Sequence, residues 1–372
     1  MKLIIERADA LATLSRVTGV VARNSNVPIL NNVLITASDD GRVTFRATDL
    51  DMEATASCAA QVSIPGVLTV DAGKLREVVA SVAAGSEISM ELDESDDPRL
   101  VVKSGRSRFK LPVIGAYSFP SIPDEKWAAT FTVPAEVFAD TLNRTVFAVG
   151  SDMAMPALHG VFLEIDGKDM IAVATNRYRV SRIINTAPKG SEKMPPVILP
   201  SKFVAQVVKA SGETGDLTVS VAKNKVRVTT EGGSLVGKTI DYDYVDYRRL
   251  IPGDHELIAR VDIQALTAAV RRAAIAGDTD KNGTGVRLSF ASGVLTIIGR
   301  NPDGEAMDEI EIDYDGPEIA IGAGYQYIVD ALANIEGETA CLGFGEKAPL
   351  IAIWSETDDA SLQLVGKRLV AK

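Results

Sequence analysis

Closely spaced acidic residues are the first candidates for chemistry in this sequence. Asp49 and Asp51 lie two residues apart in the run Ala-Thr-Asp-Leu-Asp-Met-Glu (47–53), and paired carboxylates can divide general acid and base roles. The segment 278–283 (Asp-Thr-Asp-Lys-Asn-Gly) resembles the start of a calcium loop, but the twelfth position, which needs a bidentate Glu, is Ser289. We therefore expect no bound metal, and we expect Asp49 and Asp51 to have a structural role at the end of a strand.

Nucleophilic catalysis has few candidates in this chain. Of the two histidines, His159 precedes an apolar strand and His255 adjoins a linker, so neither lies in a nucleophile arrangement. Two cysteines, Cys58 and Cys341, are too few for a disulfide framework and fit a reducing cytosol. No glycine-rich loop precedes a helix in P-loop form. We expect a non-enzymatic protein without cofactors; a hydrolase or lyase with a site at a domain junction is the less favoured alternative.

Length and charge limit the classes of protein further. The chain has 372 residues, which fit roughly two or three domains, and 46% of them are apolar. No uncharged run is long enough to cross a bilayer, and Glu6 and Arg7 interrupt the place of a signal peptide, so we expect a cytoplasmic protein without membrane contact. The net charge is -11, from 39 basic and 50 acidic residues, which by itself argues against nucleic-acid binding.

Internal repetition is the strongest signal in the sequence. Pro28 and Pro156, and likewise Leu30 and Leu158, are separated by the same interval of about 128 residues. A fainter third copy begins at Gly285 and continues through the strand around Ile297. Three units of about 124 residues account for the whole chain.

Each unit carries two helical patterns among short, alternating, β-branched segments. Apolar residues at three- and four-residue spacing predict a first helix in each unit around Leu11, Leu14, Val17 and Val21, then Phe138, Leu142 and Val146, then Leu266, Val270 and Ala274. The same spacing predicts a second helix around Leu75, Val78 and Val79, then Val204, Val207 and Val208, then Ile328, Ala331 and Leu332. Segments such as 42–47, 217–221 and 225–230 are typical of strands.

These patterns predict an α+β fold of three repeated domains, each with two helices packed on antiparallel sheets. Turn-rich segments at 118–124 and 249–254 mark the boundaries, where Pro123 and Pro252 correspond. We therefore expect domains at 1–124, 125–252 and 253–372.

Three segments give the chain a resemblance to a known family. Together with the repeated architecture, Ser104-Gly-Arg-Ser-Arg-Phe109, the run 47–53 and Asp246-Tyr-Arg-Arg249 resemble the bacterial DNA polymerase III β subunit, the sliding clamp. The resemblance covers essentially the full length. It implies a DNA clamp fold of three equivalent domains, in which two subunits close head to tail into a ring with sheets outside and helices lining the pore.

A geometric estimate independently favours a dimer over a monomer. Helices pack about 9 Å apart, so the six helices of one subunit would close a circle about 17 Å across. That is narrower than duplex DNA, which is about 20 Å wide given its groove depths. Twelve helices give a circle of roughly 34 Å, which leaves room for a duplex after one helix diameter of about 10 Å is subtracted.

A ring also changes the meaning of the acidic net charge. Weak phosphate attraction inside a closed ring holds double-stranded DNA without sequence specificity and still lets the ring slide, because topology replaces affinity. Basic residues fall in or beside the expected helices, whereas the acidic runs at 93–97, 308–313 and 356–359 fall in strand and turn regions. The residues expected to face DNA are Arg16, Arg23, Lys74, Arg76, Arg144, Lys202, Lys209, Arg271 and Arg272.

The resemblance also implies a cleft between the second and third domains that binds short peptides of partner proteins. Its expected partners are the polymerase III catalytic subunit, the clamp loader, repair polymerases and mismatch-repair proteins. Thr175 and Arg179 would offer hydrogen bonds to peptide carbonyls. The residues carried over to this cleft are Leu158, Thr175, Tyr178, Arg179, Val180, Val245, Arg249, Leu250, Val365 and Arg368. The apolar positions among them fit a domain core equally well.

Two departures from the family pattern fall at this cleft. Relatives usually read Thr-Asp-Gly-His-Arg-Leu where this chain has Thr-Asn-Arg-Tyr-Arg-Val (175–180), and they end in Met-Pro-Met-Arg-Leu where it has Val-Gly-Lys-Arg-Leu (365–369). Exchanging methionines for Val365 and Lys367 predicts a smaller, more polar socket. A specialised paralogous clamp, serving one repair polymerase or a mobile element, is therefore the alternative to the replicative processivity factor.

The resemblance places the dimer interface between the first domain of one subunit and the third domain of the other. Phe109, Leu111 and Ile275 occupy the matching positions in this chain. Ala276 stands where a larger aliphatic residue is common, which predicts a smaller buried area and a weaker dimer.

Overall fold

The computed structural model describes residues 1–22, 25–93, 95–212, 215–280 and 283–369. Its α-helices follow the predicted order: α1 (Arg7–Val17), α2 (Ala72–Ser81), α3 (Ala135–Val146), α4 (Ser201–Ser211), α5 (Ile263–Ala273) and α6 (Tyr325–Leu332). Two predicted helix ends were wrong. The helix α1 stops four residues before Val21, where the N–H of Thr18 closes the last turn on the Leu14 carbonyl, and Ala274 begins a short 3-10 helix, η5 (Ala274–Ala276).

The chain separates into two compact units, and each takes part of the central repeat. The first contains residues 1–139, 188–195 and 205–239, and the second contains residues 140–187, 196–204 and 240–372. Strand pairing explains this division, because in each unit a strand of one repeat pairs with a strand of the next. The division therefore does not follow the three predicted domain boundaries, which stay a prediction.

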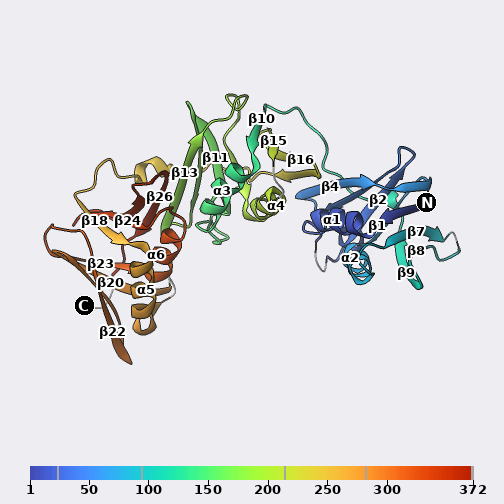
Figure 1. The fold of residues 1–372 in the computed structure, drawn as a ribbon. Coiled ribbons are helices and arrows are strands. Elements are labelled where there is room, and N and C mark those ends of the chain that lie inside the picture. Colours follow the sequence, from blue (N-terminus) through green and yellow to red (C-terminus); the bar gives the residue numbers. More distant parts are fainter. Residues whose placement is uncertain (23–24, 94, 213–214, 281–282, 370–372) are drawn as a thin grey trace. The chain divides into compact units, whose positions relative to one another are not determined.

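One long antiparallel sheet forms the first unit (Figure 1). Strand β4 pairs with β17, with Gly233 opposite Ala56, and we call this contact between the first and central repeats the first junction. The strands, in spatial order, are β10 (Ala129–Pro134), β15 (Asp216–Val221), β16 (Lys225–Thr230), β17 (Gly233–Lys238), β4 (Met52–Ala59), β3 (Arg42–Thr48), β2 (Asn32–Ser38), β6 (Gly66–Asp71), β9 (Ser107–Ile114), β8 (Arg99–Ser104), β7 (Glu87–Asp93), β1 (Lys2–Glu6) and β5 (Gln61–Ile64).

The second unit contains two sheets. Strand β13 pairs with β26, with Arg179 opposite Val365, and we call this contact between the central and third repeats the second junction. The first sheet has the order β14 (Val197–Pro200), β11 (Gly160–Asp166), β12 (Asp169–Thr175), β13 (Arg179–Thr186), β26 (Asp358–Gly366), β25 (Leu350–Ser355), β24 (Thr339–Phe344) and β18 (Leu257–Asp262). The second sheet contains β19 (Thr279–Asp280), β20 (Gly283–Ala291), β21 (Val294–Asn301), β22 (Gly304–Glu311) and β23 (Ile319–Gly324).

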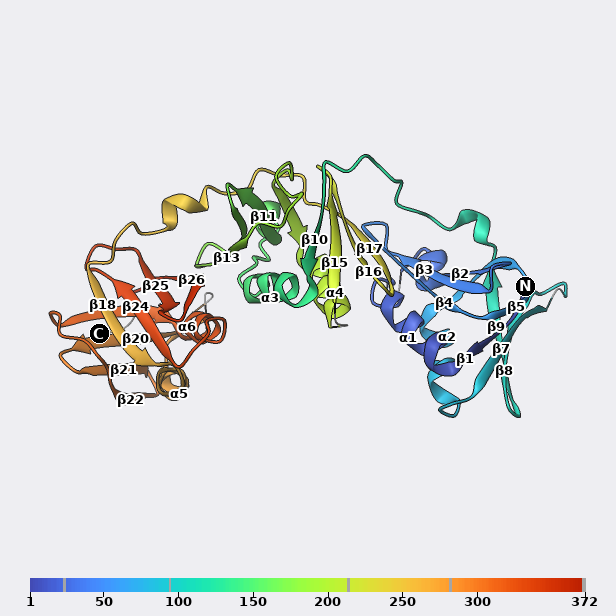
Figure 2. The same ribbon diagram turned by 45° about the horizontal axis from the view of Figure 1, so that its top comes forward.

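The helices bury one apolar face against the sheets, as their spacing predicts. In the first unit α1 and α2 lie side by side, and in the second unit α5 and α6 do the same (Figure 2). Helix α5 buries Leu266, Ala269, Val270 and Ala273, which recur at three- and four-residue spacing. Its start is fixed by Asp262, whose Oδ1 accepts the N–H of Ala265 at 2.7 Å. Asp71 caps α2 in the same way, accepting the N–H of Lys74 at 2.8 Å.

The acidic run at 47–53 has the structural role that we expected. Asp49 directly follows β3, and its Oδ1 accepts the N–H groups of Asp51 and Met52 at 3.0 and 2.7 Å, which closes the turn into β4. The Asp51 carboxylate pairs with Lys238 at 3.2 Å across the first junction. Both carboxylates therefore stabilise the fold locally.

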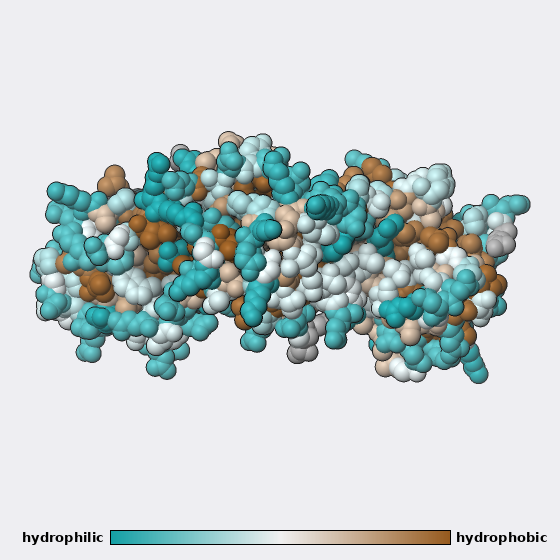
Figure 3. Space-filling model, turned by 90° about the horizontal axis from the view of Figure 1, so that it is seen from above, coloured by the Kyte–Doolittle hydropathy of each residue, from teal (hydrophilic) through white to brown (hydrophobic). Residues whose placement is uncertain are grey.

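The exposed apolar side chains of this protein are mostly separated from one another by polar residues. On the face shown in Figure 3, brown apolar areas are small and lie scattered among teal hydrophilic side chains. The most exposed large apolar side chains include Tyr117, Met153, Ile275 and Met307. Within the described ranges, none of the helices is long and apolar enough to cross a membrane.

Candidate nucleic-acid interface and partner site

Three helices of the first unit bring basic side chains to Ser15. Arg76 of α2 donates from Nε to Ser15 Oγ at 3.4 Å, and Lys209 of α4 donates from Nζ to the Ser15 carbonyl at 3.3 Å. Arg16 follows Ser15 on α1 and lies against Gly232 in the turn between β16 and β17. These residues form a cationic cluster suited to oxyanions such as phosphates.

The other basic residues expected to face DNA are distributed over three helices. Lys74 is exposed in the first turn of α2, Lys202 is exposed in the first turn of α4, and Arg271 is exposed in the last turn of α5. Arg272 is also exposed, but its guanidinium pairs with Asp308, and this hydrogen bond raises the pKa of Arg272 above its usual value. Arg23 lies outside the described residues.

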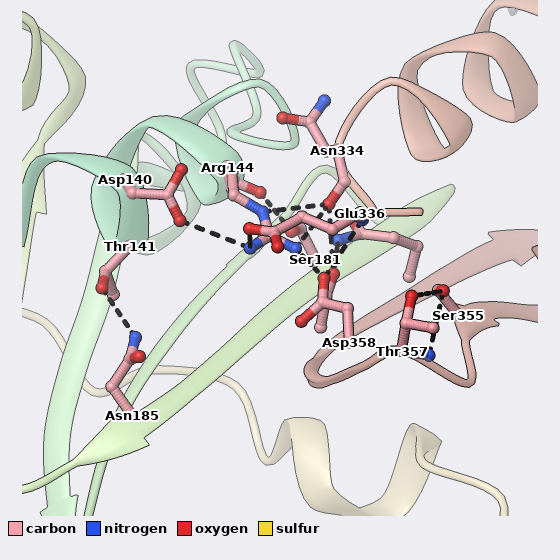
Figure 4. A network of polar contacts seen from close by, with 12 residues as sticks. Asp140, Thr141, Arg144, Ser181, Asn185, Asn334, Glu336, Ser355, Thr357 and Asp358 are labelled. Carbon is pink, nitrogen blue, oxygen red and sulfur yellow. Dashed lines mark hydrogen bonds and ion pairs between the residues drawn. The ribbon is translucent and has the colours of Figure 1, made fainter. Parts of the chain in front are cut away.

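Arg144 does not belong to a DNA-facing surface, and this prediction was wrong. The side chain is buried, with a residue exposure of 8%, and its guanidinium forms ion pairs with Asp358, Glu336 and Asp140 (Figure 4). It also donates to the Asn334 carbonyl at 3.2 Å, while the Arg144 carbonyl accepts from Ser181 Oγ at 2.8 Å. These partners come from the central repeat and from the third repeat, so the Arg144 side chain holds the second junction together.

The predicted peptide-cleft residues all lie in the second unit, around the second junction. Arg179 and Val180 begin β13, and Val365 lies opposite Arg179 on β26. The Gly366 N–H donates to the Tyr178 carbonyl at 2.7 Å, so the end of β26 lies against the turn before β13. The exposed members are Tyr178, Arg249 and Leu250, and the buried members are Leu158, Thr175, Val180 and Val365.

Two hydrogen-bonding roles predicted for the cleft are taken up within the protein. Thr175 Oγ1 donates to the Arg179 carbonyl at 2.6 Å and accepts the Arg177 N–H at 3.2 Å. The Arg179 guanidinium pairs with Asp330 and donates to the Phe147 carbonyl. In this structure, therefore, Thr175 and Arg179 hold the β12–β13 turn and the α6 helix rather than presenting donors to a peptide.

Buried members of the predicted cleft contribute to the core. Val180 packs in a cluster with Val173, Tyr247 and Leu364, while Val365 belongs to the larger core of the third repeat. Val245 is half-buried, and its carbonyl accepts the Tyr247 N–H at 2.8 Å. For Val180 and Val365 the structure supports the alternative that the sequence left open, a place in the domain core.

The polar residues at the cleft margin are held by ion pairs. Arg368 pairs with Asp280 at 3.2 Å and donates to the Gly283 carbonyl at 2.9 Å. Arg249 is exposed and pairs with Asp246 at 2.7 Å inside the motif 246–249. Lys367 donates to the Gly345 carbonyl, and burial lowers its pKa.

Sequence reasoning missed the aromatic side of this region. Tyr327 of α6 stacks on Tyr178 with ring centroids 6.2 Å apart, and the Arg179 guanidinium lies over the Phe147 and Tyr327 rings at 4.9 and 5.0 Å. Tyr325 and Tyr327 stand together in a chain with only 5% aromatic residues, and this spacing was the available signal. Asp330 lies one helical turn after Tyr327, at the spacing that places both on one face.

The predicted dimer-interface residues differ in exposure. Ile275 is 84% exposed in η5, next to strand β22, and Phe109 is half-buried on β9. Leu111 is 8% exposed in the single chain and follows Phe109 by two residues on β9, so its place in the interface stays a prediction. Ala276 is half-buried beside Ile275.

Family models match successive parts of the chain. The DNA polymerase III beta subunit matches with its N-terminal domain over residues 1–123, its central domain over 132–246 and its C-terminal domain over 248–366. The beta sliding clamp of Caulobacter vibrioides is 36% identical over 356 residues, covering 94% of both chains. The beta sliding clamp of Escherichia coli K12 is 31% identical over 343 residues, covering 91% of both chains.

Solved structures agree with these matches. The Caulobacter crescentus beta sliding clamp superposes with a TM-score of 0.95 at 33% identity, covering 100% of this chain and 99% of that one. The Bartonella birtlesii DnaN sliding clamp, solved bound to griselimycin, superposes with a TM-score of 0.94 at 28% identity over 100% of both chains. The fold is the three-domain clamp fold. The chain belongs to the DNA polymerase III beta subunit family, the non-catalytic sliding clamps of bacterial DNA replication.

Proposed function

We propose that two copies of this chain close head to tail into a ring around duplex DNA and tether the replicative polymerase in the cytoplasm. The main support for a ring of two copies is that each unit has an open sheet edge and that the two edges have opposite charge. Open strand edges expose unpaired N–H and C=O groups, which makes them templates for pairing with another chain.

The basic edge belongs to β9 in the first unit. Within the described part of the chain, β9 pairs with β6 only at Val113 and Ile114, so the outer edge of residues 107–112 has no strand partner. Arg108 and Lys110 are exposed on this edge. Phe109 lies between them, which gives the edge an apolar centre.

The acidic edge belongs to β22 in the second unit. Strand β22 pairs with β21 and ends its sheet, and it exposes Glu305, Glu309 and Glu311. The exposed Ile275 lies next to this strand. An apolar contact flanked by opposite charges favours the pairing of β9 of one copy with β22 of another. Two such contacts, one at each end of the subunit pair, would close the dimer into a ring.

Inside the ring, we assign the DNA-facing surface to the basic residues of the helices without Arg144. The cluster of Arg16, Arg76 and Lys209 supports this assignment because its members come from three helices and converge on one place. Lys74, Lys202, Arg271 and Arg272 extend the surface. We also propose the domain boundaries 1–124, 125–252 and 253–372, which assign one of the three family matches to each domain.

The partner peptides would bind at the second junction, where Tyr178 and Leu250 are exposed. We propose the polymerase III catalytic subunit, the clamp loader, repair polymerases and mismatch-repair proteins as the partners that present them. Because the Thr175 hydroxyl and the Arg179 guanidinium already have intramolecular partners, apolar and aromatic contacts should contribute most of the affinity. The cleft would then favour peptides with aliphatic or aromatic anchors.

Loading onto nicked circular DNA tests the ring. After clamp loading in moderate salt, the protein should stay on circles and leave DNA that has been linearised, because a ring slides off free ends. Equal, salt-sensitive loss from circles and linear DNA would show binding by affinity alone and would refute the ring.

A peptide titration tests the cleft. Tyr178→Ala should weaken the binding of a fluorescently labelled polymerase-derived peptide by about tenfold, since removing an aromatic anchor typically costs more than 1 kcal/mol of binding free energy. Tyr117→Ala, at an exposed tyrosine of the first unit, is the matched control. An unchanged affinity for Tyr178→Ala would show that the site lies elsewhere.

A further inference from the structure

The turn between β12 and β13 has a left-handed residue that is not glycine. Across the described ranges, Leu50 and Arg177 are the two such residues, with φ of 78° and 79°. They occupy the same place in successive repeats, because each donates its N–H to the hydroxyl of a threonine two residues earlier, Thr48 at 3.0 Å and Thr175 at 3.2 Å. This conformation is unfavourable for any residue with a Cβ, so the surrounding contacts must hold it.

The turn around Arg177 is held by its own hydrogen bonds and by packing. Asn176 Oδ1 accepts the N–H groups of Tyr178 and Arg179, each at 3.1 Å. On its other side, Asn176 lies against Gly150, where a Cβ would come within 3.5 Å of Asn176 Cα. The backbone of the turn is therefore in place before any ligand binds.

The same turn presents different side chains in the two repeats. In the first repeat it exposes Leu50 and an acid, Asp51, which is already paired across the first junction. In the central repeat it exposes Arg177, whose side chain is 60% accessible, and Tyr178, whose ring stacks on Tyr327. The second turn thus offers a cation beside an exposed aromatic ring, at the edge of the proposed peptide cleft.

Arg177 has a weaker ion pair than two other arginines at the cleft margin. Its Nη1 lies 4.0 Å from Asp152 Oδ2, and the Asp152 side chain is 57% exposed. The nearest acids of Arg249 and Arg368 lie at 2.7 and 3.2 Å. An exposed pair at the longer distance contributes little, so a carboxylate from a ligand can take the place of Asp152.

We propose that Arg177 is a specificity-determining residue of the peptide cleft and selects partner peptides that carry an acidic residue beside the apolar anchor contacting Tyr178. This inference rests on the cleft proposed above. The guanidinium can hold the peptide carboxylate through two parallel N–H donors. The adjoining Tyr178 ring takes the apolar anchor, so the cation and the aromatic ring read two neighbouring residues of one peptide.

The surroundings of Arg177 suit a single carboxylate better than a polyanion. Asp152 is close enough to repel a run of phosphates, whereas one carboxylate needs only to displace it. Met153, which follows Asp152, is 85% exposed and adds apolar surface next to the cation. A peptide with one acid among apolar residues matches this surface, and a DNA backbone does not.

Fluorescence anisotropy with the full chain tests the proposal. The probes are labelled forms of the polymerase-derived peptide in which each residue outside the apolar anchor is replaced in turn by Asp and by Asn. At the position facing Arg177, Asp should bind about fivefold tighter than Asn, which corresponds to about 1 kcal/mol. Arg177→Gln should abolish this advantage, Arg177→Glu should reverse it and Arg177→Lys should keep most of it. Lys168→Gln, at the other end of β12, is the control and should leave it unchanged.

Glycine variants separate the charge of Arg177 from its strained backbone. Arg177→Gly and Leu50→Gly both remove a Cβ from a left-handed position, so both should raise the urea midpoint of their own unit. Arg177→Gly should lose the preference for Asp, whereas Leu50→Gly should keep it. Loss of the preference in Leu50→Gly would overturn the assignment to the Arg177 charge.

The outcomes distinguish this inference from the cleft itself. Equal affinities for Asp and Asn at every position, or an unchanged advantage in Arg177→Gln, would overturn the role of Arg177 while binding that depends on Tyr178 still supports the cleft. Peptide binding that is absent, or that Tyr178→Ala leaves unchanged, would overturn both. A loss of DNA affinity in Arg177→Gln with the Asp advantage intact would assign the cation to DNA and overturn the proposal.

Discussion

Removing Arg144 should destabilise the second unit strongly, because its main partner is an almost fully buried acid. The Asp358 residue is 6% exposed and Arg144 is 8% exposed, so neither charge is well hydrated in the folded state. In Arg144→Leu, Asp358 keeps the Glu336 N–H at 3.3 Å but loses its cation. Breaking a buried pair by removing one partner costs about 3–5 kcal/mol, and this is the destabilisation we expect.

The reverse substitution should be less harmful, and the double substitution should show the coupling. In Asp358→Leu, Arg144 keeps Glu336 at 3.1 Å, Asp140 at 3.3 Å and the Asn334 carbonyl at 3.2 Å, so about 2 kcal/mol is expected. The double variant leaves no unpaired charge at this pair. It should be more stable than the sum of the single effects predicts, by about 2 kcal/mol.

Urea unfolding followed by tryptophan fluorescence can measure these differences in the second unit. The chain has two tryptophans, and Trp127→Phe leaves Trp354, which lies on β25 close to the turn before Asp358. All variants are compared in this background, and Lys202→Leu is the control for removing an exposed cation. A loss below about 1 kcal/mol in Arg144→Leu, or strict additivity in the double variant, would refute the account of Arg144 as a buried structural cation.

Three further predictions address dimerisation, DNA contact and pH. Arg108→Glu with Lys110→Glu should shift the dimer toward monomer in sedimentation, and adding Glu305→Lys with Glu309→Lys should restore it; failure of the rescue would contradict the β9–β22 contact. Lys209→Gln should lower the slope of log affinity against log salt for DNA by about 1, whereas Lys168→Gln, away from the helices, should leave it unchanged. Burial lowers the pKa of His255, which stacks on Trp354 at 4.7 Å, so the unfolded state binds more protons and stability should fall as pH drops below about 6.5. The Trp354 urea midpoint should show this fall, and His255→Phe should reduce it.

Repetition made the fold predictable from the sequence. Three sets of apolar residues at helical spacing gave the helices because each helix must bury one face against a sheet, as Leu266 and Val270 of α5 do. The end of α1 was less predictable, since Val20 is buried although it lies beyond the helix. Apolar spacing reports burial, and burial continues past a helix end.

The role of a single basic residue was not predictable from its place on a helix. Arg16 and Arg144 occupy the same position in successive repeats, yet one borders a cavity and the other is buried among acids. The acids that decide this, Glu336 and Asp358, lie about 190 and 210 residues away from Arg144 in the chain. Only the pairing of β13 with β26 brings them close.

The two junctions therefore use one architecture with different chemistry. Both join a strand of one repeat to a strand of the next. At both, an arginine from the first helix of the earlier repeat reaches a turn between two strands of the later repeat. At the second junction, the buried charges of Arg144 and Asp358 are satisfied only in one arrangement, because separating them would leave each without its partner. At the first junction, Ala12 and Gly233 stand at the positions that Asp140 and Asp358 hold at the second, and a cavity of about 190 Å³ lies beside Arg16.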